Sequence, residues 1–109
     1  MKIMFLGDVV GISGCSKIMN NLLDLIKENK INFVIVNGEN AAEAGVGLTK
    51  DICEDFFKCG VNVITTGNHV WDQKEIMNFI DKENRLLRPK NLFEPAPGKG
   101  FEIYKTSED

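Results

Sequence analysis

Five polar residues that can bind metal ions or transfer protons occur in three short loops. Asp8 lies in the first loop, Glu39 and Asn40 in the second, and Asn68 and His69 in the third. Carboxylate and amide oxygens suit magnesium, manganese or iron, and an imidazole shifts the preference towards transition metals. Each loop taken alone is better explained as a polar turn, because Asp and Asn favour turns through their own hydrogen bonds. A metal site therefore requires that the three loops meet.

The segments between the loops predict that they do meet. Each loop follows a short apolar run typical of a strand buried on both faces, and these runs are residues 2–6, 33–36 and 61–65. Apolar residues recur with helical spacing over residues 16–30, and a second helix is predicted from an N-cap at Thr49 to a stop at Gly60. This order predicts a parallel sheet whose strand ends share one edge. Because open α/β sheets bind ligands at that edge, we expect all five polar side chains there.

A third helix is predicted after the third loop. Asp72 is followed by Glu75 at the spacing of a capping box, which predicts that Asp72 is the N-cap of a helix that ends near Lys82. Trp71 precedes the expected cap and is predicted to pack on Ile76 as a hydrophobic staple.

The last part of the chain predicts two further strands. These are residues 85–89 and 101–105, separated by a loop that contains prolines. The basic residues of this region are expected at the surface, and they are Lys82, Arg85, Arg88 and Lys90. Residues 1–109 are thus expected to form a single α/β domain, with a mostly parallel sheet and flanking helices.

Composition narrows the class of protein. A formal net charge of −3 and a pI near 5.2 disfavour binding to long nucleic acid, which needs a cationic surface. The first apolar run is interrupted by Gly7 and Asp8, so it is too short for a membrane span or a signal peptide. Three cysteines without a Cys-x-x-Cys pair indicate reduced thiols. We therefore expect a cytoplasmic protein with no membrane partner.

Four motifs, in this order and spacing, resemble those of the YmdB-like metallophosphoesterases. The motifs are Gly7-Asp8-Val9-Val10-Gly11, Asn37-Gly38-Glu39-Asn40-Ala41-Ala42 with Gly45-Val46-Gly47 after it, Thr66-Gly67-Asn68-His69-Val70-Trp71-Asp72, and Arg88-Pro89-Lys90-Asn91. That family consists of calcineurin-type phosphodiesterases that act on 2',3'-cyclic mononucleotides. The resemblance covers essentially the whole chain. It implies the amino-terminal half of a layered α/β sandwich, in which this chain forms the first sheet and its helices.

The resemblance also implies roles for the five polar residues. Asp8 would bind one metal ion, Glu39 would bridge two ions, Asn40 would complete the first site and Asn68 would join the second. His69 would donate a proton to the leaving alkoxide. The implied cofactors are two divalent ions, iron or manganese, and the implied substrate is a small phosphodiester such as 2',3'-cyclic AMP.

One departure from the family pattern leaves a second interpretation open. The family supplies three further histidine ligands from its carboxyl-terminal half, whereas this sequence contains only His69. The chain is therefore interpreted either as part of a working phosphodiesterase or as an inactive truncated or split product. Such a product would keep the fold and serve as a weak metal-binding or assembly module. A homo-oligomer or a separate carboxyl-terminal chain are the partners that would complete the site.

Overall fold

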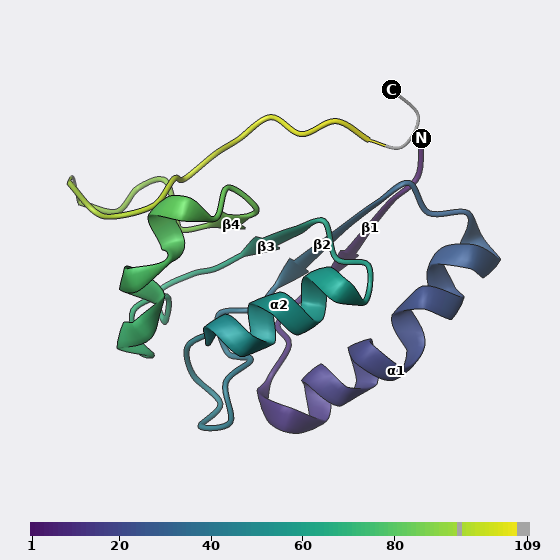
Figure 1. Ribbon diagram of the computed structural model, residues 1–109, viewed down its shortest axis with the longest axis horizontal. Helices are drawn as coiled ribbons and strands as arrows, with labels where there is room; N and C mark the ends of the chain where they lie inside the picture. Colours follow the sequence, from purple (N-terminus) through teal and green to yellow (C-terminus); the bar gives the residue numbers. More distant parts are fainter. Residues whose placement is uncertain (94, 107–109) are drawn as a thin grey trace.

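The protein forms a parallel sheet with helices packed on it (Figure 1). The computed structural model describes residues 1–93 and 95–106. The elements follow in the order β1 (Ile3–Leu6), α1 (Gly11–Asn29), β2 (Phe33–Asn37), α2 (Lys50–Lys58), β3 (Val63–Thr65), the 3-10 helices η1 (Lys74–Asn78) and η2 (Ile80–Lys82), and β4 (Leu86–Leu87). The strands lie in the order β1-β2-β3-β4, and each neighbouring pair is parallel. The predicted α/β class is confirmed.

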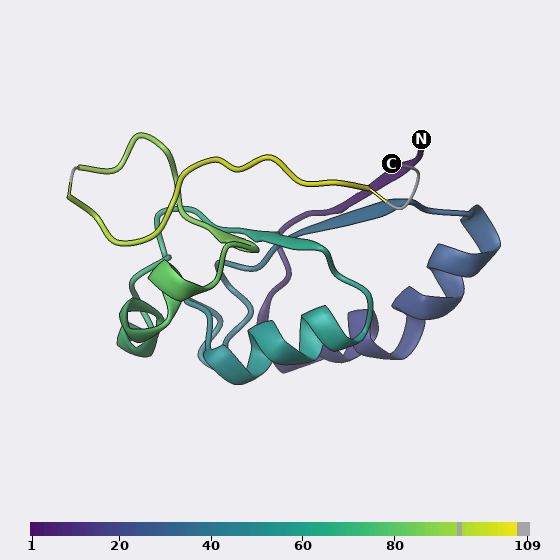
Figure 2. The ribbon, with the colours of Figure 1, turned by 45° about the horizontal axis from the view of Figure 1, so that its top comes forward.

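The helices cover one face of this sheet (Figure 2). Right-handed crossovers between strands in consecutive order place every crossover helix on the same side. Val36 and Ile64 belong to a buried core that includes Leu22 of α1 and Phe56 of α2. None of the helices in the described part of the chain has the length and apolarity needed to cross a membrane.

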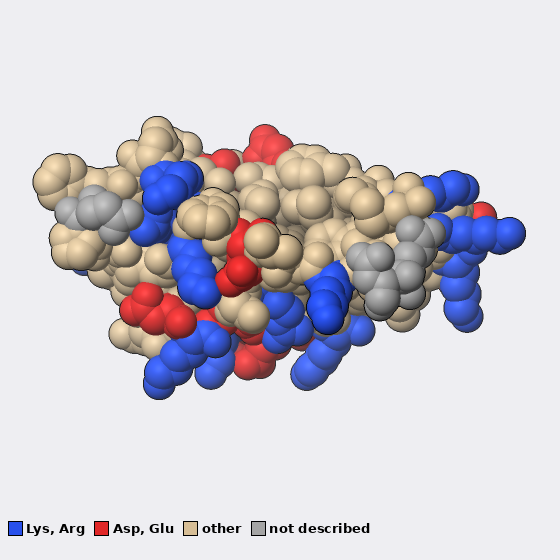
Figure 3. All heavy atoms as spheres, turned by 90° about the horizontal axis from the view of Figure 1, so that it is seen from above, with Lys and Arg blue, Asp and Glu red and all other residues tan. Residues whose placement is uncertain are grey.

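Strand β1 was predicted to be buried on both faces, and this was wrong. Its side chains alternate, so that Ile3 is 53% exposed and Phe5 is 61% exposed while Met4 and Leu6 pack against the core. The reason is the position of β1 at the edge of a sheet with helices on one face only. Much of the surface in the view of Figure 3 is formed by residues other than Lys, Arg, Asp and Glu.

Residues 99–106 run back past the sheet on the side away from the helices (Figure 2). The ring of Tyr104 lies 5.9 Å from that of Phe33, measured between centroids. The strand predicted over residues 101–105 is wrong, because this segment has no regular structure. Among the described residues, this region joins the sheet through one isolated β-bridge, between Leu87 and Lys99.

The helix predictions met different outcomes. The predicted cap of α2 is confirmed, because the backbone amide of Ile52 donates to Thr49 Oγ1 over 3.3 Å. Helix α1 begins at Gly11, earlier than predicted, and its N-cap residue, Val10, makes no side-chain cap hydrogen bond. Without a polar cap, the sequence carried no signal for this start.

The predicted capping box is wrong. The N-cap position of η1 is Gln73, and the side chain of Asp72 contacts His69. Glu75 Oε1 accepts a hydrogen bond from the backbone amide of Lys50 over 2.8 Å, so it serves the start of α2. The expected third α-helix is replaced by the two short 3-10 helices.

Arg88 was predicted at the surface, and this too was wrong. It is only 5% exposed. Its guanidinium donates to the carbonyl oxygens of Pro89, Ala96 and Pro97 over 3.1–3.3 Å. These bonds hold the irregular loop that follows β4, which explains why a charged side chain is buried there.

Candidate functional site

The three polar loops line one cavity at the carboxyl ends of β1, β2 and β3. The cavity measures about 420 Å³. All five residues singled out from the sequence contribute to its lining, namely Asp8, Glu39, Asn40, Asn68 and His69. The structure therefore brings the whole predicted set together at the sheet edge where α/β proteins bind ligands.

Backbone hydrogen bonds hold the loops against one another. The amide of Gly11 donates to the carbonyl of Asn40 over 2.9 Å and joins the first loop to the second. The amide of Gly38 donates to the carbonyl of Thr65 over 2.9 Å and joins the second loop to the end of β3. The loops are thus placed by the sheet and by each other.

Asp8 and Asn40 form a polar pair within the cavity. Asp8 has a φ of 45°, in the left-handed region that Asp tolerates better than most residues. Asn40 Nδ2 donates to Asp8 Oδ1 over 2.9 Å. A carboxylate only accepts hydrogen bonds, so this contact turns the amide of Asn40 with its Oδ1 away from Asp8.

The side-chain oxygen of Asn40 lacks a hydrogen bond among the described residues. Asn40 Oδ1 is buried and has no hydrogen-bond partner within residues 1–93 and 95–106. Leaving a buried acceptor unpaired costs about 1–3 kcal/mol, so such an atom calls for an explanation. A bound cation would satisfy it. The chemistry of the donor set, two carboxylates and two amides, fits a hard divalent ion.

Glu39 lies against a glycine that sequence reasoning did not single out. A Cβ atom at Gly67 would lie 2.2 Å from Glu39 Oε1 and 2.5 Å from Oε2, so only glycine admits the carboxylate in this position. The backbone amide of His69 also donates to Glu39 Oε2 over 3.3 Å. The third loop therefore helps to place the carboxylate of the second. The available signal was the glycine directly before Asn68.

Sequence reasoning also misassigned Asp72. Its Oδ2 lies 2.8 Å from Nδ1 of His69, and the two side chains are 40% and 36% exposed, respectively. The three-residue spacing between His69 and Asp72 was a signal for this contact, whereas the predicted cap rested on the spacing between Asp72 and Glu75.

The donors supplied by this chain are few. Among the described residues, no group of three or more His, Cys, Asp or Glu side chains is placed to hold a metal ion. The cavity instead combines the carboxylates of Asp8 and Glu39 with the amides of Asn40 and Asn68. It offers hard oxygen donors that fit a metal ion without enclosing one.

The cysteines lie outside this chemistry. All three are free and buried, namely Cys15, Cys53 and Cys59. Burial raises the pKa of each thiol, which disfavours the reactive thiolate. Cys15 Sγ donates to the carbonyl of Ala41 over 3.3 Å, in the segment that follows the second loop. Its contribution is to packing.

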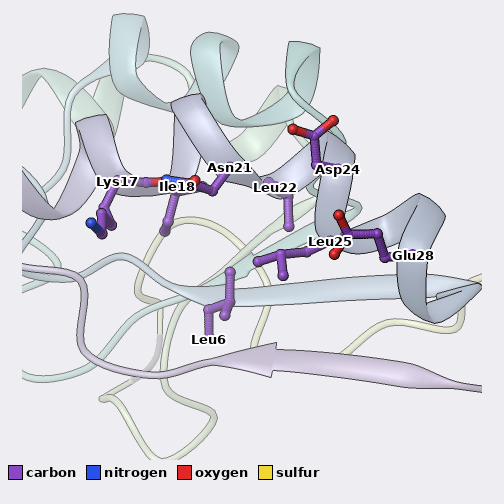
Figure 4. A pocket seen from close by; sticks show the side chains of 8 residues that line it. All are labelled: Leu6, Lys17, Ile18, Asn21, Leu22, Asp24, Leu25 and Glu28. Atoms are coloured by element: carbon purple, nitrogen blue, oxygen red, sulfur yellow. The ribbon is translucent and has the colours of Figure 1, made fainter.

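A second cavity lies between α1 and β1 and measures about 400 Å³ (Figure 4). Leu6, Leu22 and Leu25 project into it, and charged side chains of α1 stand at its rim. Its apolar walls continue the core at the open edge of the sheet. It lacks a converging set of metal donors and is separate from the polar loops.

Comparison with known proteins assigns the family. A model of the family described as YmdB-like protein matches residues 4–109. The chain belongs to this family. It is 45% identical over 107 residues to a 2',3'-cyclic-nucleotide 2'-phosphodiesterase of Bacillus subtilis, an alignment that covers 98% of this chain and 40% of that protein.

Two solved structures share the fold of this YmdB-like chain. A hypothetical protein from Thermus thermophilus matches with a TM-score of 0.88 and 34% identity, over 98% of this chain and 41% of the other. A novel phosphatase from Mycoplasma pneumoniae matches with a TM-score of 0.83 and 39% identity, over 95% and 39%. The chain thus spans about two-fifths of the length of these relatives.

Proposed function

We propose that this chain supplies one part of a dinuclear metal site that hydrolyses small phosphodiesters. The observation that carries the proposal is the buried Oδ1 of Asn40, which has no hydrogen-bond partner among the described residues and lies in a cavity lined by Asp8, Glu39 and Asn68. An acceptor held in this way, beside two carboxylates, is suited to a cation. Membership of the YmdB-like family supports the same chemistry, because the Bacillus subtilis relative is named as a phosphodiesterase.

In this proposal each loop has a defined task. Asp8 and Asn40 would hold one ion, Asn68 would hold a second, and Glu39 would be shared between the two. Two divalent ions, iron or manganese, would supply Lewis acidity and a water molecule with a lowered pKa. Asn40 also fixes the orientation of the Asp8 carboxylate through its Nδ2. Gly67 leaves room for the Glu39 carboxylate.

His69 is the proposed proton donor. It lines the same cavity as the four metal donors, so its ring can reach a leaving oxygen of a phosphodiester held there. The proposed substrate is a 2',3'-cyclic nucleotide, as in the name of the Bacillus subtilis relative. The proposed setting is the cytoplasm, which suits three free thiols.

A second candidate is an inactive piece that binds metal weakly or serves assembly. The observation that favours it is the donor set of this sequence, which contains a single histidine, His69. Four donors for two ions leave open coordination positions. A partner that supplies imidazoles, as a separate chain or a second copy, would then be required for turnover.

The test compares the chain alone with a completed chain. Release of nucleoside monophosphate from 2',3'-cyclic AMP is measured with manganese or iron for the purified chain, and for a fusion to the part of the Bacillus subtilis relative that it does not match. We expect almost no activity from the chain alone and metal-dependent activity from the fusion, abolished by Asn68→Ala. A folded fusion that binds metal but never hydrolyses the substrate would contradict the proposal.

A further inference from the structure

Asp72 is a charged side chain whose contact with His69 replaces the capping role expected of it. Its Oδ2 lies 2.8 Å from Nδ1 of His69. A carboxylate has no hydrogen to donate, so the shared hydrogen belongs to the ring nitrogen. We propose that Asp72 is a positioning residue that holds His69 in the Nδ1–H form and leaves Nε2 available to the cavity. This inference rests on the proposed function, in which His69 delivers a proton.

The turn that carries both residues is fixed at several points. The amide of Val70 donates to the carbonyl of Gly67, and the amide of Asp72 donates to the carbonyl of His69, each over 3.1 Å. Val70 is fully buried, with 0% of its surface exposed. Two successive turns around a buried anchor therefore place the carboxylate beside the imidazole.

Both ends of this turn are tied to the second loop. The amide of His69 donates to Glu39 Oε2 over 3.3 Å. At the other end, Gln73 Nε2 donates to the carbonyl of Val46 over 3.1 Å. The turn is thus held against the loop that carries Glu39, which places the backbone of His69 and Asp72 beside the proposed metal donors.

The orientation has a chemical consequence. A protonated His69 gives up the hydrogen on Nε2: the Nε2–H bond breaks, an O–H bond forms on the leaving alkoxide, and the ring returns to its neutral Nδ1–H form. Asp72 accepts a hydrogen from Nδ1 before and after this transfer. It therefore keeps the proton that moves on the nitrogen that is free to face the substrate.

Stability alone gives a weak reason for the pair. Both side chains are more than one-third exposed, and an exposed ion pair contributes only about 0–1 kcal/mol. A merely stabilising contact would hold the same tautomer, because the carboxylate cannot donate. The two explanations therefore differ in what they predict for turnover: only a positioning role predicts that kcat falls while KM is retained when Asp72 is changed.

Nuclear magnetic resonance can read the tautomer directly, because His69 is the only histidine in the sequence. The nitrogen-15 shifts of the imidazole are recorded without metal, at a pH where the ring is neutral. We expect Nδ1 to show the shift of a protonated nitrogen and Nε2 that of a bare one. In Asp72→Asn, whose amide can donate or accept, we expect the population to move towards the Nε2–H form that free histidine prefers, and Asp72→Glu should restore the Nδ1–H form.

Asp24→Asn is the matched control, because it removes the same charge from an exposed position on α1 and should leave the ring shifts unchanged. An Nε2–H ring in the unmodified protein, or ring shifts that ignore Asp72→Asn in a folded chain, would overturn the inference. These spectra need neither metal nor turnover, so the inference about Asp72 can be refuted whether or not the proposed function holds. In the active fusion, Asp72→Asn should lower kcat by roughly 10- to 100-fold with KM retained, a part of what a general acid contributes.

Discussion

Replacing Gly67 with alanine should separate metal binding from stability. The added Cβ would lie 2.2 Å from Glu39 Oε1 and 2.6 Å from its Cδ. The carboxylate must therefore retreat by roughly 1 Å or more to reach ordinary contact distances. It would also loosen its hydrogen bond with the amide of His69. Because Glu39 is the proposed bridge between two ions, a displacement of this size should be felt at both.

We expect the Gly67→Ala chain to bind Mn²⁺ about 10- to 100-fold more weakly, the range seen when a residue that supports a metal ligand is altered. Its unfolding free energy should change little. The atoms displaced belong to the end of a side chain, and alanine gains about 0.4–1 kcal/mol by restricting the unfolded state. Calorimetric titration with Mn²⁺ and urea denaturation measure the two quantities on the same samples.

Gly7→Ala serves as the control for this experiment. A Cβ at Gly7 would meet only the ring of Phe5, at 3.7 Å, which is an ordinary contact. We expect its Mn²⁺ affinity to match that of the unmodified chain. Equal affinities in the unmodified and Gly67→Ala chains would refute the argument, because they would mean that the position of the Glu39 carboxylate has no part in binding metal.

Three other predictions concern stability. Glu75→Ala should cost about 1 kcal/mol in urea denaturation, as much as a lost helix cap, because Glu75 accepts from the amide of Lys50; a silent mutation would argue against that bond. Arg88→Met should lower the unfolding free energy by roughly 2–3 kcal/mol, since three carbonyls lose a charged donor. Arg88→Lys should recover little of this loss, because lysine lacks the planar fork of donors; full recovery by lysine would exclude a need for the guanidinium. Burial raises the pKa of the Cys53 thiol, so the protonated thiol contributes fully to the unfolding free energy below the ordinary thiol pKa of about 8.5, and this contribution is lost as the pH rises above that value. The unfolding free energy should therefore decline above this pH, and less steeply in Cys53→Ala. Identical slopes in the two proteins would contradict this.

The features that the sequence predicted correctly depend on local patterns. The apolar runs of β2 and β3, and the polar loops that follow them, are contiguous, so the parallel sheet and the meeting of Asp8, Glu39 and Asn68 follow from order alone. The cap at Thr49 acts on an amide three residues away. Such features carry their own signal.

The errors depend on contacts between distant segments. Glu75 was assigned to Asp72 by spacing, but it bonds to Lys50, which lies 25 residues earlier. The burial of Arg88 depends on an irregular loop that folds back over it, eight to nine residues later in the chain. The exposure of Phe5 depends on β1 being an edge strand, a property of the whole sheet. No local pattern encodes these partners.

The consecutive strand order has a consequence for how the chain is made. Each strand pairs with the one synthesised just before it, so the sheet can grow by one strand and helix at a time as the nascent chain leaves the ribosome. Ile3 pairs with Phe33, Ile35 with Val63 and Ile64 with Leu86, so each crossover closes a shorter loop than pairing with any earlier strand would, and costs less entropy. The loops of Asp8 and Glu39 would come together when β2 pairs with β1, and the loop of Asn68 would be added to them when β3 pairs with β2.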